Sequence, residues 1–283
     1  MRQNCTGAIL LYHRIAEAKA DPYGLCTTPL CFEQQMRFVR DRCHVLPLED
    51  LVLGAATNSL DARSVAITFD DGYLDNLHTA SVILAREGLS ATFFLCTANL
   101  NQPAPFWWDV IAEAGLADAQ DLRNRLMALD VGARSDLLSD VVSGLVDTGA
   151  LPRPMSSIEI CRLAAVDGVS IGAHTTNHLY LPAQREHICL RELLESKTAL
   201  ETLLQRPIHA VAYPFGGFTD CVKHAAMGVG FKTGVTTRLG AVDCSSDPLA
   251  LPRIEVRPET NVEQVLETLF VVEPGRATLN GPC

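Results

Sequence analysis

Short apolar runs that end abruptly in polar residues recur along this chain, with helical patterns between most of them. They lie at residues 8–12, 65–69, 91–96, 169–173, 208–213, 232–236 and 253–256. Apolar runs of roughly four to eight residues are typical of buried strands. Alternation of such strands with helices predicts an α/β fold with a parallel sheet, open or closed into a barrel, and of these two we expect the barrel.

Helical patterns fill most of the intervals between the runs. Thr28 and Pro29 are typical of an N-cap and a first helical residue, and apolar side chains then recur at spacings of four and three up to Val39. We predict further helices over 74–87, closed by Gly88, and over 185–205. The segment 101–165 breaks the rhythm, because it is mostly helical and contains no convincing strand. We interpret it as an insertion that packs outside the sheet or covers the functional site.

Composition narrows the class of protein. Hydrophobic residues make up 48% of the 283 residues and charged residues 20%, which excludes a disordered chain. The net charge of −10 and scattered basic residues disfavour a nucleic-acid partner. No stretch approaches the roughly 20 apolar residues of a membrane span, and Ala8–Tyr12 is too short for the core of a signal peptide. We therefore expect a cytoplasmic protein.

The most informative motif joins an apolar strand directly to two carboxylates and a glycine. It runs from Ala66 to Tyr73 and contains Asp70, Asp71 and Gly72. Adjacent side chains of a strand point to opposite faces, so the two aspartates need not share one role. Parallel α/β folds place their active sites at the carboxyl ends of the strands. The alternative is a polar turn that caps the next helix.

A second motif ends another predicted strand with two histidines. His174 and His178 are four residues apart, a spacing that would place both imidazoles on one side of a helical turn. With a carboxylate from another strand end they supply two nitrogens and one oxygen. This ligand set suits Zn²⁺ with positions left open for water and substrate, as in catalytic rather than structural sites.

A third motif, residues 210–217, is a strand that ends in a Pro-Phe-Gly turn. Taken alone, it is better explained as a strand terminator. The alternative is that its exposed backbone N–H groups stabilise an oxyanion.

Together these motifs resemble the polysaccharide deacetylase family, also called NodB-homology or carbohydrate esterase family 4 proteins. Residues 68–72 and 174–178 match closely and occur in the family's order. Weaker similarity covers segments spread over most of the chain, at 11–13, 106–109, 213–216 and 251–254. The resemblance implies one domain over 1–283, a distorted (β/α)7-type barrel with the mostly helical insertion at 101–165.

The resemblance also implies the chemistry of the site. It assigns a divalent metal, most readily Zn²⁺ with Co²⁺ or Ni²⁺ as alternatives, to three ligands: Asp71, His174 and His178. Asp70 would be the general base, and the Phe215 N–H would hold the oxyanion. Tyr213, in the same motif, is a further candidate for contact with the oxyanion or the substrate. Trp107 and Trp108 could stack on a sugar, although aromatic pairs in helices are more often packing anchors.

Two departures from the commonest family pattern concern the remaining roles. The family's leucine-x-histidine motif near the C-terminus is missing, because the last histidine is His224. Some members resemble circular permutants, and residues 11–13 fit that variant, so His13 is the candidate general acid. Where many members have an arginine that orients the catalytic aspartate, this chain has Ala212, and we expect Arg253 to replace it.

The expected function is a metal-dependent N-deacetylase that hydrolyses the acetamide of an N-acetylated sugar or glycosylated small molecule. A sugar deformylase would need the same metal and acid–base pair and a different acyl pocket. An alternative from another functional class is a carbohydrate-binding barrel without catalytic activity. The missing C-terminal histidine motif and the alanine at position 212 favour it, whereas the intact carboxylates and histidines argue against it. A phosphoester hydrolase is less favoured, since such sites usually gather more carboxylates or a second metal.

Overall fold

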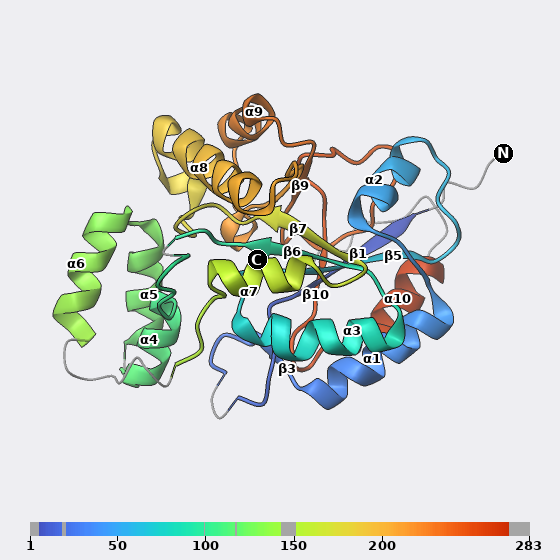
Figure 1. Ribbon diagram of the computed structural model, residues 1–283, viewed down its shortest axis with the longest axis horizontal. Helices are drawn as coiled ribbons and strands as arrows, with labels where there is room; N and C mark the ends of the chain where they lie inside the picture. Colours follow the sequence, from blue (N-terminus) through green and yellow to red (C-terminus); the bar gives the residue numbers. More distant parts are fainter. Residues whose placement is uncertain (1–5, 19–20, 99, 117, 143–150, 272–283) are drawn as a thin grey trace.

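A parallel sheet curled into a half-barrel forms the centre of the protein (Figure 1). The structure is a computed structural model that describes residues 6–18, 21–98, 100–116, 118–142 and 151–271. The sheet follows the order β10 (Ile254–Glu255), β1 (Gly7–Tyr12), β5 (Ser64–Phe69), β6 (Ala91–Leu95), β7 (Val169–Ala173), β8 (Ala210–Ala212) and β9 (Thr233–Val235). Every pairing between these strands is parallel, so the expected α/β barrel-like architecture is confirmed.

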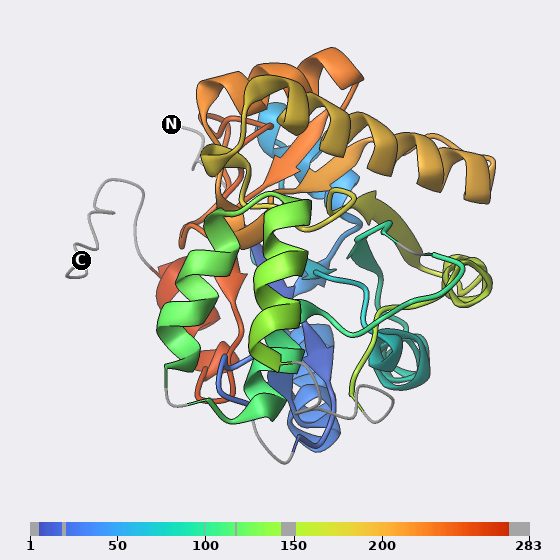
Figure 2. The same ribbon diagram turned by 90° about the vertical axis from the view of Figure 1, so that its left-hand side faces the viewer.

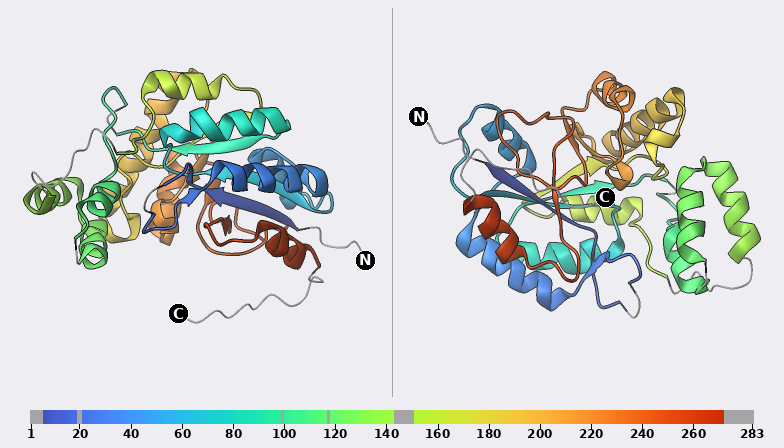
Figure 3. Two further views of the ribbon diagram at one scale, coloured as in Figure 1. Left: turned by 90° about the horizontal axis from the view of Figure 1, so that it is seen from below. Right: turned by 180° about the vertical axis from the view of Figure 1, so that it is seen from behind.

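Segments from opposite ends of the chain meet in this sheet. β1 pairs with β10, with Leu10 opposite Ile254, and on its other side β1 pairs with β5. Both views of Figure 3 show the blue N-terminal strand beside the red C-terminal region. The carboxyl ends of β1, β5 and β10 are thereby brought together, as the site requires.

Helices cover the outer face of the sheet. They are α1 (Pro29–Arg42), α3 (Ser81–Glu87) with a preceding π-helical turn η1 (Asn76–Ala80), α7 (Ser157–Ala164), α8 (Glu186–Leu204), α9 (Asp220–Val229) and α10 (Val262–Val271). The predicted start of α1 is confirmed, because the Thr28 side chain accepts a hydrogen bond from the Cys31 N–H. Gly88 closes α3 in the left-handed conformation, also as predicted.

Alternation along the strands separates two apolar cores. Leu10 and Ile67 belong to the core beneath the outer helices, whereas their neighbours Ile9 and Ala66 belong to an inner core. Helix α2 (Leu48–Ala56) contributes Leu51 to this inner core and packs against β1 and β5. The close approach of Leu51 to Gly7 places α2 at the amino ends of these strands, opposite the site.

The segment 101–165 is mostly helical, as predicted, but its parts have different positions. Helices α4 (Trp107–Ala114), α5 (Ala119–Ala128) and α6 (Val131–Val142) form an apolar cluster of their own. Figure 2 shows the green helices of this cluster in front of the sheet. Helix α7, by contrast, packs on β7 and α8 and belongs to the outer helical layer. Residues 117 and 143–150 of the segment lie outside the described residues.

Three short strands, all pairing in parallel, were not predicted: β2 (Arg14–Ile15), β3 (Cys26–Thr27) and β4 (His44–Val45). Within the part of the chain that the structure describes, no helix combines the length and apolar character that crossing a bilayer requires.

Candidate active site

Two adjacent carboxylates leave the end of β5 in different directions. Asp70 continues the strand, where its N–H donates to the Tyr12 carbonyl of β1 at 2.9 Å. Asp71 adopts the left-handed conformation with φ of 71°, and Gly72 follows with φ of 79°. A Cβ at Gly72 would lie 2.8 Å from the Leu95 side chain, so the turn needs glycine here. Both carboxylates are buried and lie in one site.

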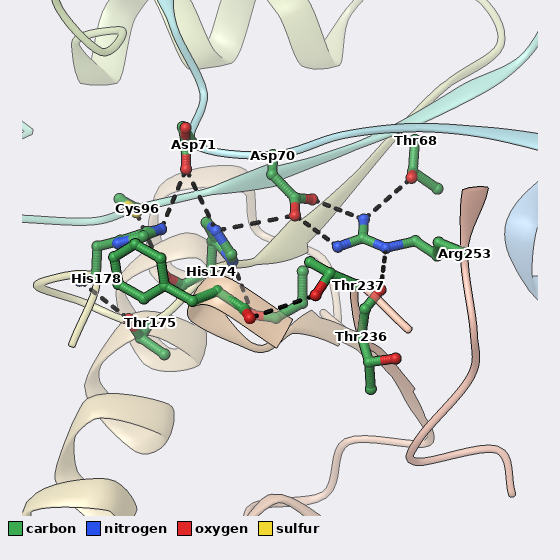
Figure 4. A network of polar contacts seen from close by, with 12 residues as sticks. Thr68, Asp70, Asp71, Cys96, His174, Thr175, His178, Thr236, Thr237 and Arg253 are labelled. Carbon is green, nitrogen blue, oxygen red and sulfur yellow. Dashed lines mark hydrogen bonds and ion pairs between the residues drawn. The ribbon is translucent and has the colours of Figure 1, made fainter. Parts of the chain in front are cut away.

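Asp71 lies between two imidazoles (Figure 4). Its Oδ1 is 3.3 Å from Nε2 of His174 and 3.3 Å from Nε2 of His178. The three candidate ligand atoms lie within 4.8 Å of one another, and all three residues are buried. Nδ1 of His174 donates to the Ala212 carbonyl at 2.8 Å, which leaves its Nε2 free of a proton in the neutral ring. Two nitrogens and one oxygen thus converge, and this donor set fits a divalent metal.

The histidine pair does not lie on a helical turn, and that expectation was wrong. His174 follows β7, and the chain then reverses in a loop in which Thr175 and His178 have φ of 62° and 50°. The buried Glu192 carboxylate of α8 stabilises this loop, accepting hydrogen bonds from the N–H groups of Thr176 (3.1 Å) and Asn177 (2.7 Å). A carboxylate acceptor for successive loop amides therefore replaces the helical hydrogen bonds that the spacing suggested.

Asp70 forms a two-pronged ion pair with Arg253. Nη1 and Nη2 of Arg253 donate to Oδ1 and Oδ2 of Asp70 at 2.8 and 2.6 Å. The same guanidinium donates to the Thr236 carbonyl at 2.8 Å and to the Thr68 hydroxyl at 3.1 Å. Arg253 has no exposed surface, and these four hydrogen bonds fix its guanidinium. The fixed guanidinium in turn orients the plane of the Asp70 carboxylate.

The charges of the site fix the protonation states. Burial opposes ionisation of Asp70, but the neighbouring Arg253 and His174 outweigh it and hold its pKa below the usual range. Burial likewise opposes ionisation of Asp71, yet the contacts of this carboxylate with the two imidazoles outweigh burial and lower its pKa. Burial lowers the pKa of His178 to about 4. Two carboxylates and a neutral His178 imidazole are therefore present at neutral pH.

A pocket of about 300 Å³ opens above these groups. Among the residues singled out in the sequence, it is lined by His13, Asp70, Asp71, Trp108, His174, His178 and Phe215. Trp108 is 4.6 Å from the His178 ring, centre to centre, and its Nε1 donates to the Tyr73 hydroxyl at 2.7 Å. His13 lies at the carboxyl end of β1, as its place after that strand suggested.

Two predicted substrate-binding residues lie outside the pocket lining. Trp107 is 7% exposed and packs in the apolar cluster of α4–α6. Tyr213 is fully buried, stacks on Phe218, and donates its hydroxyl proton to the Leu249 carbonyl at 3.0 Å. Both side chains are therefore packing residues in this structure.

Several residues that shape the site were missed in the sequence. Glu192 could have been noticed, because it is the acidic member of the otherwise uncharged buried stripe of α8: Cys189, Glu192, Leu193, Ser196 and Leu200. Arg134 of α6 is buried and its Nη2 donates to the Asn177 carbonyl at 2.8 Å. Nothing in the local pattern distinguishes Arg134 from a surface arginine. Tyr23 and Arg123, in the pocket lining, had no motif around them either.

Comparison with known proteins identifies the family. The sequence profile described as polysaccharide deacetylase matches residues 57–234, more than half of the chain. The chain belongs to the polysaccharide deacetylase family. The matched region of this deacetylase contains Asp70, Asp71, His174 and His178, whereas β1 with His13 and β10 with the preceding Arg253 lie outside it.

Three proteins that this chain resembles share less than a quarter of its residues in the aligned regions. YxkH of Bacillus subtilis (strain 168), a protein assigned to the polysaccharide deacetylases, is 23% identical over 252 residues, covering 88% of this chain and 71% of YxkH. The deacetylase PplD of Streptococcus pyogenes, solved in complex with acetate, has a TM-score of 0.69 and 24% identity over 94% of this chain and 99% of PplD. IcaB from Ammonifex degensii has a TM-score of 0.66 and 20% identity, with 94% and 97% covered. These solved structures share the fold.

Proposed function

We propose that this protein is a metal-dependent N-deacetylase that hydrolyses the acetamide of an N-acetylated sugar or glycoconjugate. Membership of the polysaccharide deacetylase family gives the reaction class. The observation that carries the finer proposal is the buried cluster of Asp71, His174 and His178 at the floor of a pocket, beside an ionised Asp70.

In this proposal Asp71, His174 and His178 hold a divalent ion, with Zn²⁺ the first expectation. The bound ion would polarise the amide carbonyl and lower the pKa of a water molecule. Asp70 accepts the proton of the attacking water, and Arg253 keeps that carboxylate ionised and oriented. The Phe215 N–H donates to the developing oxyanion, and His13 donates a proton to the departing sugar amine.

The test measures acetate and formate release from N-acetylated and N-formylated sugars, nucleotide sugars and chitooligosaccharides. Chelated and zinc-restored enzyme are compared, and bound zinc is quantified in each variant. We expect zinc-dependent acetate release, loss of zinc in Asp71→Ala, and retained zinc in Asp70→Asn with turnover reduced about a hundredfold or more. Formate release without acetate release would instead identify a deformylase.

The proposed acid has its own control. His13→Ala should lower kcat, while His187→Ala, which removes an exposed histidine of α8, should leave it unchanged. Zinc retained with no acyl release from any substrate would contradict catalysis and favour a carbohydrate-binding barrel. Full activity of Asp70→Asn would contradict its role as the base.

A further inference from the structure

One wall of the pocket carries a guanidinium that has no carboxylate partner among the described residues. Arg123 of α5 lines the pocket, and no ion pair within the described ranges includes it. Its Cζ lies over two aromatic rings, 5.0 Å from the centre of Tyr23 and 5.7 Å from that of Phe215. Stacking on ring faces holds a guanidinium while leaving its in-plane N–H donors available. Arg123 is therefore positioned to bind an anion from the pocket.

The other groups of this wall leave the charge of Arg123 uncompensated. Arg257 also lines the pocket, but its Nη2 is paired with the Glu255 carboxylate at 3.0 Å. Tyr23 contributes a hydroxyl that is buried without a hydrogen-bond partner in the described part of the chain. A buried hydroxyl normally has a partner, so the Tyr23 hydroxyl is a further donor for a polar group that binds beside Arg123.

Arg123 is close enough to the metal ligands to contact the same substrate. The Phe215 ring lies 4.6 Å from the His178 ring, centre to centre, and 5.7 Å from Cζ of Arg123. One aromatic ring thus separates the guanidinium from the centre where the acetamide would be hydrolysed. An anion at Arg123 would be a substituent of the reacting sugar or of the unit next to it.

We propose that the substrate carries an anionic group, a phosphate ester or a carboxylate, which binds Arg123 in the wall of the pocket. The proposal rests on the N-deacetylase function and names its substrate class. The net charge of −10 argues against a general affinity for anions, so selectivity comes from this one group. A guanidinium suits both candidates, because it donates two parallel hydrogen bonds to phosphate or carboxylate oxygens.

The experiment compares matched acetamido sugars: N-acetylglucosamine 1-phosphate, N-acetylglucosamine 6-phosphate, the corresponding uronic acid and the neutral methyl glycoside. Acetate release is measured with the zinc enzyme, Arg123→Gln and the control Arg125→Gln, which changes an exposed arginine of the same helix. We expect a lower KM for at least one anionic sugar. Arg123→Gln should raise that KM about five- to tenfold and leave the KM for the neutral sugar unchanged. Arg125→Gln should change neither KM.

Calorimetric titration of the same zinc enzymes with each anionic sugar separates this proposal from the proposed function. Binding of an anionic sugar that weakens in Arg123→Gln and not in Arg125→Gln supports the anion site, even if no acetate is released. If binding behaves in this way and no acetate is released, the deacetylase function is contradicted and the anion site is not. Equal KM for neutral and anionic sugars overturns the anion site. The anion site is also overturned if Arg123→Gln changes KM equally for neutral and anionic sugars, or if the binding of anionic sugars does not depend on Arg123. In each of these cases, acetate release would still support the proposed deacetylase function.

Discussion

Asp70 and Asp71 are adjacent in the chain, yet their shortest contacts are with different residues, although His174 lies near both carboxylates. Asp70 keeps the strand direction and meets Arg253, while the left-handed backbone of Asp71 turns its carboxylate toward the histidines. The division of roles that strand alternation suggested is thus compatible with the geometry. The left-handed backbone at Asp71, which brings both carboxylates into one site, could not be predicted from the sequence alone.

Removal of Arg253 should destabilise the fold as well as the proposed base. Arg253→Met leaves the buried Asp70 carboxylate without its ion-pair partner, which should cost about 3–5 kcal/mol of unfolding free energy. Urea unfolding in chelator, which excludes effects of metal loss, measures this cost. The double variant with Asp70→Asn removes the charge and should recover part of the loss. A double variant less stable than Arg253→Met would contradict the ion-pair explanation.

Asp109 gives a prediction about pH. Burial raises its pKa to about 7, against the hydrogen bond that Tyr73 donates to it at 2.8 Å. Between the unfolded pKa of about 3.9 and about 7, the folded state keeps a proton that the unfolded state releases, so this group lowers stability as pH rises. Asp109→Asn should therefore raise Tm by a few degrees at pH 8 and change it little at pH 4. Asp121→Asn, at an exposed position of α5, is the control, and a Tm gain that is equal at both pH values would refute the prediction.

At the scale of elements, helices far apart in the chain stabilise the histidine loop. Glu192 of α8 accepts from its amides, and Arg134 of α6 donates to its Asn177 carbonyl. Arg134 is 8% exposed, and its guanidinium lies 5.8 Å from the ring centre of Trp107. The helical insertion is therefore connected to the candidate metal site through Arg134.

Loss of this connection should weaken metal binding. Arg134→Met keeps the apolar volume but removes the hydrogen bond that holds the loop, and we expect zinc affinity to fall about 10- to 100-fold. Competition with a chromogenic chelator measures the affinity. Arg125→Met, which changes an exposed arginine of α5, should retain normal affinity. Unchanged affinity in Arg134→Met would show that Glu192 is sufficient to hold the loop.

Sequence patterns predicted elements better than they predicted loops. Strand and helix positions follow from local periodicity, so α1 and α8 and the six-residue β1 and β5 agree closely with expectation. The path from His174 to His178 depends on Glu192, eighteen residues after His174, and on Arg134. Spacing carries no information about such tertiary partners, which is why a helical turn was expected there.

For the whole molecule, the amino ends of the strands and the pocket at their carboxyl ends are separate regions. Leu51 of α2 is fully buried in the inner core at the amino ends of β1 and β5, away from the pocket. Leu51→Ala should lower the unfolding free energy by about 2–5 kcal/mol. Its kcat, measured at a temperature at which the variant is folded, should be unchanged. Leu53→Ala, at a position 63% exposed on the same helix, should change stability by less than about 0.5 kcal/mol. A large fall in kcat for folded Leu51→Ala would contradict this separation.

The parallel fold and the closely spaced motifs could be predicted, because each depends on residues within one or two elements. Arg253 could be named only through the resemblance, since its partner Asp70 is 183 residues away in the chain. Trp107 and Trp108 could not be distinguished for another reason. They are adjacent in the chain, and helix periodicity does not tell which of two adjacent indoles faces a pocket. The contents of the pocket wall, Tyr23 and Arg123 among them, depend on how the insertion packs and carry no local signal.

The pairing of β1 with β10 also determines when the site is completed during synthesis. A nascent chain that has emerged only as far as β9 already contains the three candidate metal ligands, Asp71, His174 and His178. Its Asp70 has no guanidinium beside it until residue 253 has left the ribosome and the last strand has docked. Incomplete chains would therefore contain every candidate metal ligand but no oriented Asp70 carboxylate, and the complete site would arise only in the finished fold.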